Sequence, residues 1–428
     1  MSASCFILCR VVDHYGDAGV CWRLTRQLEN EYGLDVTLFI DDLATLQRLA
    51  PTLDTTQDRQ HVDRVTVQRL TDAPPPPASH ASFWPDVIID AFGGGLPASW
   101  LTALKRDFPP LAADAHTSLS PGGRGAGGEE DKPIAPRWIV LEYLSAEPWI
   151  ETMHGLVSPP PSINIPRHFF FPGFTETTGG LLREKTLLDE RNVFCSPQHF
   201  PDTRRAFLEK LGVRTLSPNA LLVSLFCYDT PALPALLDAL AASPSPIVCL
   251  IPETVASKAV QQWRNLHSAK ASATLAIHST TKHGSLTLHT IPFLSQTDFD
   301  RLLWSCGLNF VRGEDSFVRA QWAANPFIWQ AYQQTEQVHL TKVDAFLERY
   351  LADAPDDLKT ALSDFTYAWN DEQRINHIAN FWSSLIKQLP SFEKLACDWE
   401  QQQSTQPDLA QRLVDFIGRG EQSEPRQN

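Results

Sequence analysis

The feature that most constrains the fold is a regular alternation of strand-like and helix-like segments, which occurs twice along the chain. Short apolar runs typical of buried strands lie at residues 4–12, 35–40, 86–90, 138–141, 221–226, 247–251, 285–290 and 308–311. Segments of helical period, such as residues 20–31, lie between them. This alternation predicts parallel sheets with crossover helices, and therefore an α/β fold.

The stretch FFFPGFTETTGG, near residues 170–185, separates the two series and is rich in proline and glycine. We therefore predict one α/β domain over residues 1–178 and a second over residues 179–372. Residues 373–428 are predicted as C-terminal helices with a polar tail. The low-complexity glycine-rich segment 118–132 is predicted as an insertion into the first domain.

Composition excludes several classes of protein. Among 428 residues, 36 Lys and Arg stand against 50 Asp and Glu, for a net charge of -14. This balance argues against a nucleic-acid partner and against a polybasic membrane binder. A run of about 18 uncharged apolar residues, as a membrane span requires, is not found, nor is the basic start of a secretory signal. The eight cysteines mostly lie in apolar runs without a C-x-x-C pair, which favours free thiols over disulfides or zinc. We expect a cytoplasmic protein.

Residues 13–19, DHYGDAG, follow the first strand, where a dinucleotide-binding fold carries G-x-G-x-x-G. Here Asp13 and Asp17 flank Gly16 and Gly19 and would repel a diphosphate, which disfavours a nicotinamide oxidoreductase. The loop fits a cationic or proton-giving ligand better, and the dipole of the following helix stabilises a carboxylate that serves as a base. A structural role, in which Asp17 only caps the helix, is the alternative.

Residues 309–322, NFVRGEDSFVRAQW, are typical of a strand, a tight loop and a helix. Arg312 offers a forked cation to phosphate oxygens, and Ser316 lies among the free amides of the helix start. Glu314 and Asp315 cannot both face a phosphate, so one is expected to bind sugar hydroxyls or to stabilise a cationic centre. The alternative is a capped helix with a surface ion pair.

Two further strand ends carry side chains suited to a nucleotide. Phe226 and Tyr228 lie at one, and Phe293 and Gln296 lie in the turn after another. Gln296 can pair with a pyrimidine imide in both donor and acceptor senses. Each aromatic residue alone also fits a core position, but their recurrence at strand ends favours a ligand site, because ligands of open α/β sheets bind at the carboxyl edge.

Two long segments, VVDHYGDAGVCWRLTRQL and PFLSQTDFDRLLWSCGLNFVRGEDSFVRAQWA, resemble the elongation factor P arginine rhamnosyltransferases (EarP-type). LEYLSAEPWI and FFFPGFTETTGGLLRE are also similar to that family. The resemblance implies a GT-B glycosyltransferase fold, in which an N-terminal Rossmann-like acceptor domain and a C-terminal Rossmann-like nucleotide-sugar domain face each other across a cleft. It also implies an inverting, metal-independent enzyme without a cofactor. Such an enzyme transfers L-rhamnose from dTDP-β-L-rhamnose to an arginine of elongation factor P and thereby activates that factor.

The resemblance also implies a role for each matched residue. Asp17 matches the general base, Asp13 its companion aspartate, and Glu314 an acidic residue needed for activity. Asp17 and Glu314 are also expected among the substrate contacts. The other expected contacts are His14, Tyr15, Gly16, Phe226, Tyr228, Phe293, Leu294, Ser295, Gln296, Arg312, Gly313, Asp315 and Ser316.

Two other functions fit part of this pattern. A GT-B sugar-nucleotide transferase or epimerase that acts on a small molecule would keep the donor pocket without a protein acceptor. A nucleotide-sensing module without catalysis would bind dTDP without turnover, but the paired aspartates argue against it.

Overall fold

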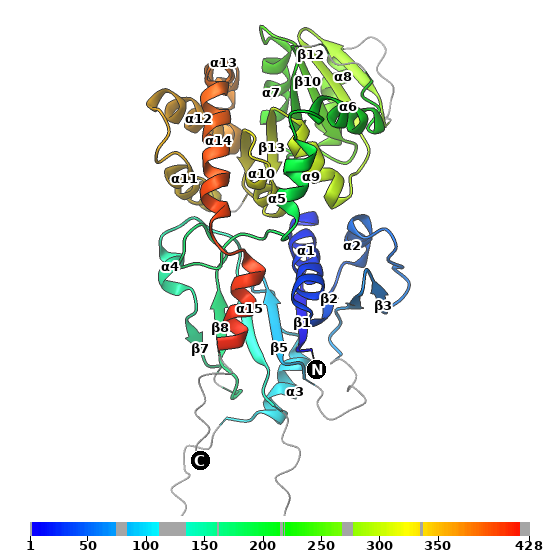
Figure 1. Ribbon diagram of the computed structural model, residues 1–428, viewed down its shortest axis with the longest axis vertical. Coiled ribbons are helices and arrows are strands. Elements are labelled where there is room, and N and C mark those ends of the chain that lie inside the picture. The colour runs from blue at the N-terminus through cyan, green and yellow to red at the C-terminus, as the bar shows by residue number, and fades with distance from the viewer. Residues whose placement is uncertain are drawn as a thin grey trace, which may run out of the picture. The chain divides into compact units, whose positions relative to one another are not determined.

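A computed structural model describes residues 2–73, 84–110, 134–160, 162–214, 217, 219–267, 277–333 and 337–419. The chain forms two compact units (Figure 1). Unit 1 comprises Met1–Leu144, Trp149–Leu182 and Asp408–Asn428, and unit 2 comprises Ser145–Pro148 and Arg183–Pro407. The predicted insertion at 118–132 lies outside the described residues.

Unit 1 contains a mostly parallel sheet with the strand order β3-β4-β2-β1-β5-β6-β8-β7. Its strands are β1 (Ser4–Cys9), β2 (Asp35–Ile40), β3 (Arg59–Val62), β4 (Val65–Arg69), β5 (Val87–Ala91), β6 (Arg137–Leu141), β7 (Val157–Ser158) and β8 (Arg167–Phe170). The pairs β3–β4 and β7–β8 are antiparallel. The chain leaves β1 toward β2 and later adds β5 to the opposite side of β1. The carboxyl ends of β1 and β5 therefore form the topological switch point of this sheet, where α/β folds bind ligands.

The helices of unit 1 are α1 (Tyr15–Tyr32), α2 (Leu43–Leu49), α3 (Ala98–Asp107), α4 (Trp149–Met153) and α15 (Leu409–Arg419). Two predicted bounds near the first loop were wrong. The first strand ends at Cys9, not at residue 12, because carboxylates bind the backbone N–H groups of residues 11–13 in place of a neighbouring strand. The following helix begins at Tyr15, so Gly16, Asp17 and Gly19 lie in its first turns.

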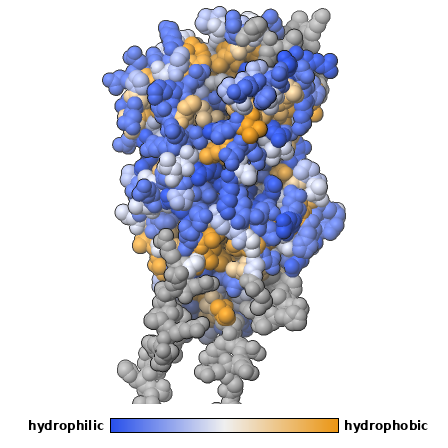
Figure 2. Space-filling model, viewed as in Figure 1, coloured by the Kyte–Doolittle hydropathy of each residue, from blue (hydrophilic) through white to orange (hydrophobic). Residues whose placement is uncertain are grey.

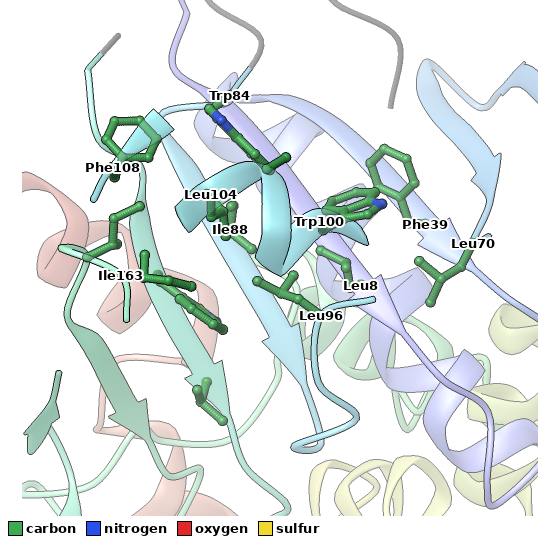
Figure 3. Close-up of a cluster of buried hydrophobic side chains, with 14 residues drawn as sticks. Leu8, Phe39, Leu70, Trp84, Ile88, Leu96, Trp100, Leu104, Phe108 and Ile163 are labelled. Carbon is green, nitrogen blue, oxygen red and sulfur yellow. The ribbon is translucent and has the colours of Figure 1, made fainter. Parts of the chain in front are cut away.

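A core of aromatic and aliphatic side chains holds the sheet of unit 1 under α3 (Figure 3). The Trp100 ring of α3 meets the Phe39 ring edge-on at 5.0 Å, and Leu8 and Ile88 of the neighbouring strands are buried in the same cluster. The Trp100 indole nitrogen donates to the carbonyl of Ala73 at 3.0 Å. Each such buried side chain contributes about 1.5–3 kcal/mol, so strands β1, β2 and β5 are firmly held below the switch point.

Unit 2 repeats this plan with the strand order β11-β12-β10-β9-β13-β14. Its strands are β9 (Leu221–Leu225), β10 (Ile247–Pro252), β11 (Thr280–His283), β12 (Leu286–Ile291), β13 (Leu308–Arg312) and β14 (Phe327–Gln330). The pair β11–β12 is antiparallel and the other pairs are parallel. Because β9 is followed by β10 on one side and later by β13 on the other, the switch point of unit 2 lies at the carboxyl ends of β9 and β13.

The α-helices of unit 2 are α5 (Leu187–Phe194), α6 (Phe200–Lys210), α7 (Ala232–Ala241), α8 (Ser257–His267), α9 (Gln296–Ser305), α10 (Asp315–Trp322), α11 (Val338–Tyr350), α12 (Asp356–Asn370), α13 (Ile378–Leu385) and α14 (Leu389–Ser404). The C-terminal helices are divided between the units. Helices α13 and α14 belong to unit 2, whereas α15 belongs to unit 1, where Arg412 donates to the carbonyl of Thr175 at 3.0 Å.

The face of the molecule in Figure 2 is mostly hydrophilic, with separate hydrophobic patches. Such patches are normal on folded proteins. Among the described residues, no helix is both long enough and apolar enough to span a membrane.

Candidate functional site

The predicted site residues lie at the carboxyl ends of strands. Those of residues 13–17 follow β1 in unit 1, and the others lie at or just beyond the ends of β9, β12 and β13 in unit 2. Each unit therefore carries its own set of predicted site residues.

In unit 1, the carboxylate of Asp17 organises the loop between β1 and α1. Its Oδ2 accepts hydrogen bonds from the backbone N–H groups of Val12 and Asp13, both at 2.8 Å, and its side chain is buried. Asp17 is the third residue of α1, and the N-cap position belongs to His14, whose side chain makes no cap hydrogen bond. Asp17 therefore has a structural role, although not as the N-cap. From the first turn of α1, its side chain binds the backbone of the preceding loop.

Asp13 lies directly over the start of α1, at Gly16. The Gly16 N–H donates to the carbonyl of Asp13 at 2.7 Å. A Cβ atom added to Gly16 would lie 2.6 Å from Oδ2 of Asp13, closer than van der Waals contact allows. Glycine at this position therefore lets the carboxylate of Asp13 approach the first turn of the helix.

A second carboxylate outside the loop also holds it in place. Oδ1 of Asp41, which directly follows β2, accepts the Val11 N–H at 2.9 Å. The consecutive N–H groups of Val11, Val12 and Asp13 therefore all donate to aspartates. Sequence reasoning missed Asp41, because its role depends on the pairing of β1 with β2 rather than on a local motif.

Sequence reasoning also missed the other loop of this switch point, which follows β5. Asp90 is buried, and its Oδ1 accepts the Gly95 N–H at 3.0 Å. Burial, reinforced by the charge of Glu142, raises the pKa of Asp90 to about 6. Phe92 has a φ of 61°, which is unusual for a residue other than glycine, and its ring stacks on Tyr143 at 4.5 Å. The run FGGG after the predicted strand at 86–90 was the available sequence signal.

In unit 2, β13 ends at Arg312 and α10 begins at Asp315, with Glu314 at its N-cap position. The hydroxyl of Ser316 accepts the Arg312 N–H at 3.0 Å and donates to the Arg312 carbonyl. The side chain of Ser316 therefore links the first turn of α10 to the last residue of β13. The backbone N–H groups of the first turn of α10 are the part of this segment suited to an anion.

The structure brings Arg312 and Tyr228 together. The guanidinium carbon of Arg312 lies 4.6 Å from the centre of the Tyr228 ring, a cation–π contact. Phe226, which is half-buried, packs edge-on against Phe299 of α9 at 4.6 Å.

The turn from β12 into α9 carries the remaining predicted residues. Ser295 is the N-cap of α9 and accepts the Asp298 N–H at 3.2 Å. Leu294 and Gln296 on either side of it are buried, and Phe293 is half-buried. The contacts predicted for these residues with a nucleotide stay predictions.

A match to a known protein family covers nearly the whole chain. The family described as Elongation-Factor P (EF-P) rhamnosyltransferase EarP matches residues 5–418. The chain belongs to this family. The resemblance predicted from the sequence motifs is thereby confirmed, and so is the prediction that the chain is an enzyme of the glycosyltransferase class.

Individual members of the EarP family match this chain over nearly the full length of both proteins. Protein-arginine rhamnosyltransferases from Pseudomonas putida and Pseudomonas aeruginosa are each 41% identical to this chain and cover 97% of it. The chain covers 99% and 98% of these relatives. A structure solved for EarP-mediated arginine glycosylation of translation elongation factor EF-P has 32% identity, a TM-score of 0.62 and coverage of 98% of this chain and 99% of that one.

The predicted fold class is confirmed by this EarP structure and by the two Rossmann-like sheets, which are the elements of a GT-B glycosyltransferase. The roles assigned to individual residues stay predictions. Among the described residues, no group of three or more His, Cys, Asp or Glu side chains is arranged to hold a metal ion.

Proposed function

We propose that this EarP family member transfers L-rhamnose from dTDP-β-L-rhamnose to an arginine side chain of elongation factor P, and that it acts in the cytoplasm. The observation that carries the proposal is the contrast between the two switch points in a chain that matches the family over residues 5–418. Aspartates dominate the loop after β1, whereas Arg312 and a helix N-terminus follow β13. These features suit a cationic acceptor in unit 1 and an anionic donor in unit 2.

The acceptor side requires a base. A guanidinium has a pKa above about 12, so it reacts only when a positioned carboxylate orients one nitrogen and removes its proton as the C–N bond forms. Oδ2 of Asp17 is engaged by two backbone N–H groups, so we assign proton removal to Oδ1. Asp13 holds the rest of the cationic fork. Proton loss is late and coupled to bond formation, because a free carboxylate cannot deprotonate arginine on its own.

The donor side must stabilise the departing dTDP. Arg312, Ser316 and the backbone N–H groups at the start of α10 provide this stabilisation without a metal ion or other cofactor, and Asp315 is expected to contact the sugar. Glu314 supports the oxocarbenium-like sugar or orients the acceptor. Attack opposite the leaving group inverts the anomeric centre, so the β-linked donor gives an α-linked product.

Intact-mass analysis of elongation factor P tests the proposal. After incubation with the protein and dTDP-β-L-rhamnose, we expect a gain of one deoxyhexose on the factor. A factor whose acceptor arginine is replaced by lysine should gain nothing. Transfer to free arginine or to another small molecule, with none to the factor, would contradict the proposal and favour the small-molecule alternative.

A further inference from the structure

Gln330, the last residue of β14, makes contacts with both loops of the unit 2 switch point. The residue is buried, with 1% of its surface exposed. Its side-chain Oε1 accepts the Tyr228 N–H at 2.8 Å, and its backbone carbonyl accepts the Gly313 N–H at 3.2 Å. Tyr228 lies beyond the end of β9, so its N–H needs an acceptor from outside that strand.

The neighbouring residue, Trp329, completes the attachment. Its indole N–H donates to the Gly313 carbonyl at 2.9 Å, and its ring stacks on Phe317 of α10 at 4.1 Å. Both backbone groups of Gly313 are therefore held by consecutive residues of β14. Gly313 has a φ of 59°, in the left-handed region that favours glycine, so the turn into α10 is defined by these contacts.

The chemistry of Gln330 suits a site that binds an anion. A buried N–H could be satisfied equally well by a glutamate at this position. A carboxylate there, however, would place a negative charge beside Arg312 and compete for it with a diphosphate. The neutral amide of Gln330 accepts the Tyr228 N–H without that penalty.

We infer that Gln330 is a positioning residue for donor binding: it fixes the loop after β9 relative to the loop between β13 and α10, so that Tyr228 lies against Arg312. The inference rests on the proposed function, because it assumes that these two loops bind dTDP-β-L-rhamnose. Gln330 acts through Tyr228 and Gly313 and does not itself contact the donor.

The test is Gln330→Met, which keeps the size of the side chain and removes its acceptor. We expect KM for dTDP-β-L-rhamnose and the calorimetric Kd for dTDP to rise about tenfold, equivalent to about 1.4 kcal/mol, with kcat little changed. Backbone hydrogen exchange at Tyr228 should also become faster without any donor, a readout that is independent of the proposed function.

Gln321→Met is the matched control. Gln321 is also buried in unit 2, where its Oε1 accepts the indole N–H of Trp399 at 2.8 Å. The Gln321→Met variant should have lower thermal stability, but its KM for dTDP-β-L-rhamnose and its Kd for dTDP should not change. If Gln330→Met does the same and no more, Gln330 has only a structural role and the inference is wrong.

Trp329→Phe decides the question if Gln330→Met does not fold. It removes the indole N–H that donates to Gly313 and keeps an aromatic ring against Phe317. A rise of about threefold in donor KM is expected, and an unchanged KM would overturn the inference. If the unaltered protein fails to modify elongation factor P while Gln330→Met still accelerates exchange at Tyr228, the proposed function fails but the positioning contact stands.

Discussion

The two switch points have the same topology but are built from different chemical groups. In unit 1, backbone N–H groups of the loops donate to the carboxylates of Asp17, Asp41 and Asp90. In unit 2, the equivalent N–H groups donate to the hydroxyl of Ser316 and to the neutral acceptors of Gln330.

If the proposed function is correct, this difference prepares two ligand sites of opposite charge within one fold. A backbone N–H is satisfied by a charged or by a neutral acceptor, so loop geometry alone does not dictate the choice. In the proposed function, the carboxylates of the loop after β1 suit a guanidinium. In unit 2, the acceptors of Gln330 and Ser316 add no negative charge beside Arg312, which is what we expect of a site for an anion.

The comparison is tested most severely at Asp17. We expect Asp17→Asn to reduce kcat for rhamnosylation by about 10²–10⁴-fold, because the amide keeps an acceptor for the loop N–H groups but cannot take a proton. Calorimetric binding of dTDP should stay unchanged, since the donor is assigned to unit 2. Near-normal transfer by this variant in the intact-mass assay would remove Asp17 as the base.

Removal of the positive charge of Arg312 in unit 2 is expected to have a smaller effect. Arg312→Ala should weaken dTDP binding by about 10–100-fold, because a charge-assisted contact to the diphosphate is lost, worth about 1.5–3 kcal/mol. Arg301→Ala is the control. Arg301 is a half-buried arginine of α9 that pairs with Asp298 at 3.1 Å, and its loss should leave the Kd unchanged. Equal weakening in both variants would indicate general charge attraction rather than a site.

The position of Asp13 gives a third test. In Gly16→Ala the new methyl group would meet Oδ2 of Asp13 at 2.6 Å, so the carboxylate must move. We expect kcat to fall about tenfold without a change in donor KM, because misplacement of a catalytic group by about 1 Å is costly. Gly418→Ala in α15 is the control, since its added Cβ has no neighbour within 4 Å. Unchanged kcat in Gly16→Ala would mean that the position of Asp13 is unimportant.

The sequence predicted the two α/β halves and the family correctly, because strand and helix periodicity and two long motifs are local signals. It also pointed to Arg312 and Tyr228, which the structure brings into contact. Arg312 is the last residue of β13, and Tyr228 follows β9. These two strands are neighbours in the sheet although they lie far apart in the sequence. The rule that ligands bind at carboxyl edges made that inference possible.

What the sequence did not predict depends on pairing between distant segments. Asp41 and Gln330 act on loops that only the strand order brings beside them. The start of α1 was misplaced because Gly16 and Gly19 resemble loop residues, whereas the hydrogen bonds of Asp17 allow the helix to begin at Tyr15. Local propensity cannot reveal such a tertiary contact.

Asp90 provides the mildest test, through stability. Its pKa of about 6 lies above the ordinary 3.8 because burial disfavours the charged form. The folded state therefore binds an extra proton between about pH 4 and pH 6, and the protein loses stability as the pH rises through that window. Asp90→Asn is neutral and keeps an acceptor for the Gly95 N–H. We expect it to raise the thermal midpoint at pH 7.5, where the ionised carboxylate costs on the order of 2–3 kcal/mol, and to have little effect at pH 5.

Asp107→Asn is the control of opposite sign for this pH dependence. The hydrogen bond from Arg106 holds the pKa of Asp107 below its ordinary value, so the ionised form stabilises the fold. That contribution is present above the ordinary pKa and is lost as the pH falls, so Asp107→Asn should lower the midpoint at pH 7.5. If Asp90→Asn shifted the midpoint equally at pH 5 and pH 7.5, ionisation of Asp90 would not be the cause.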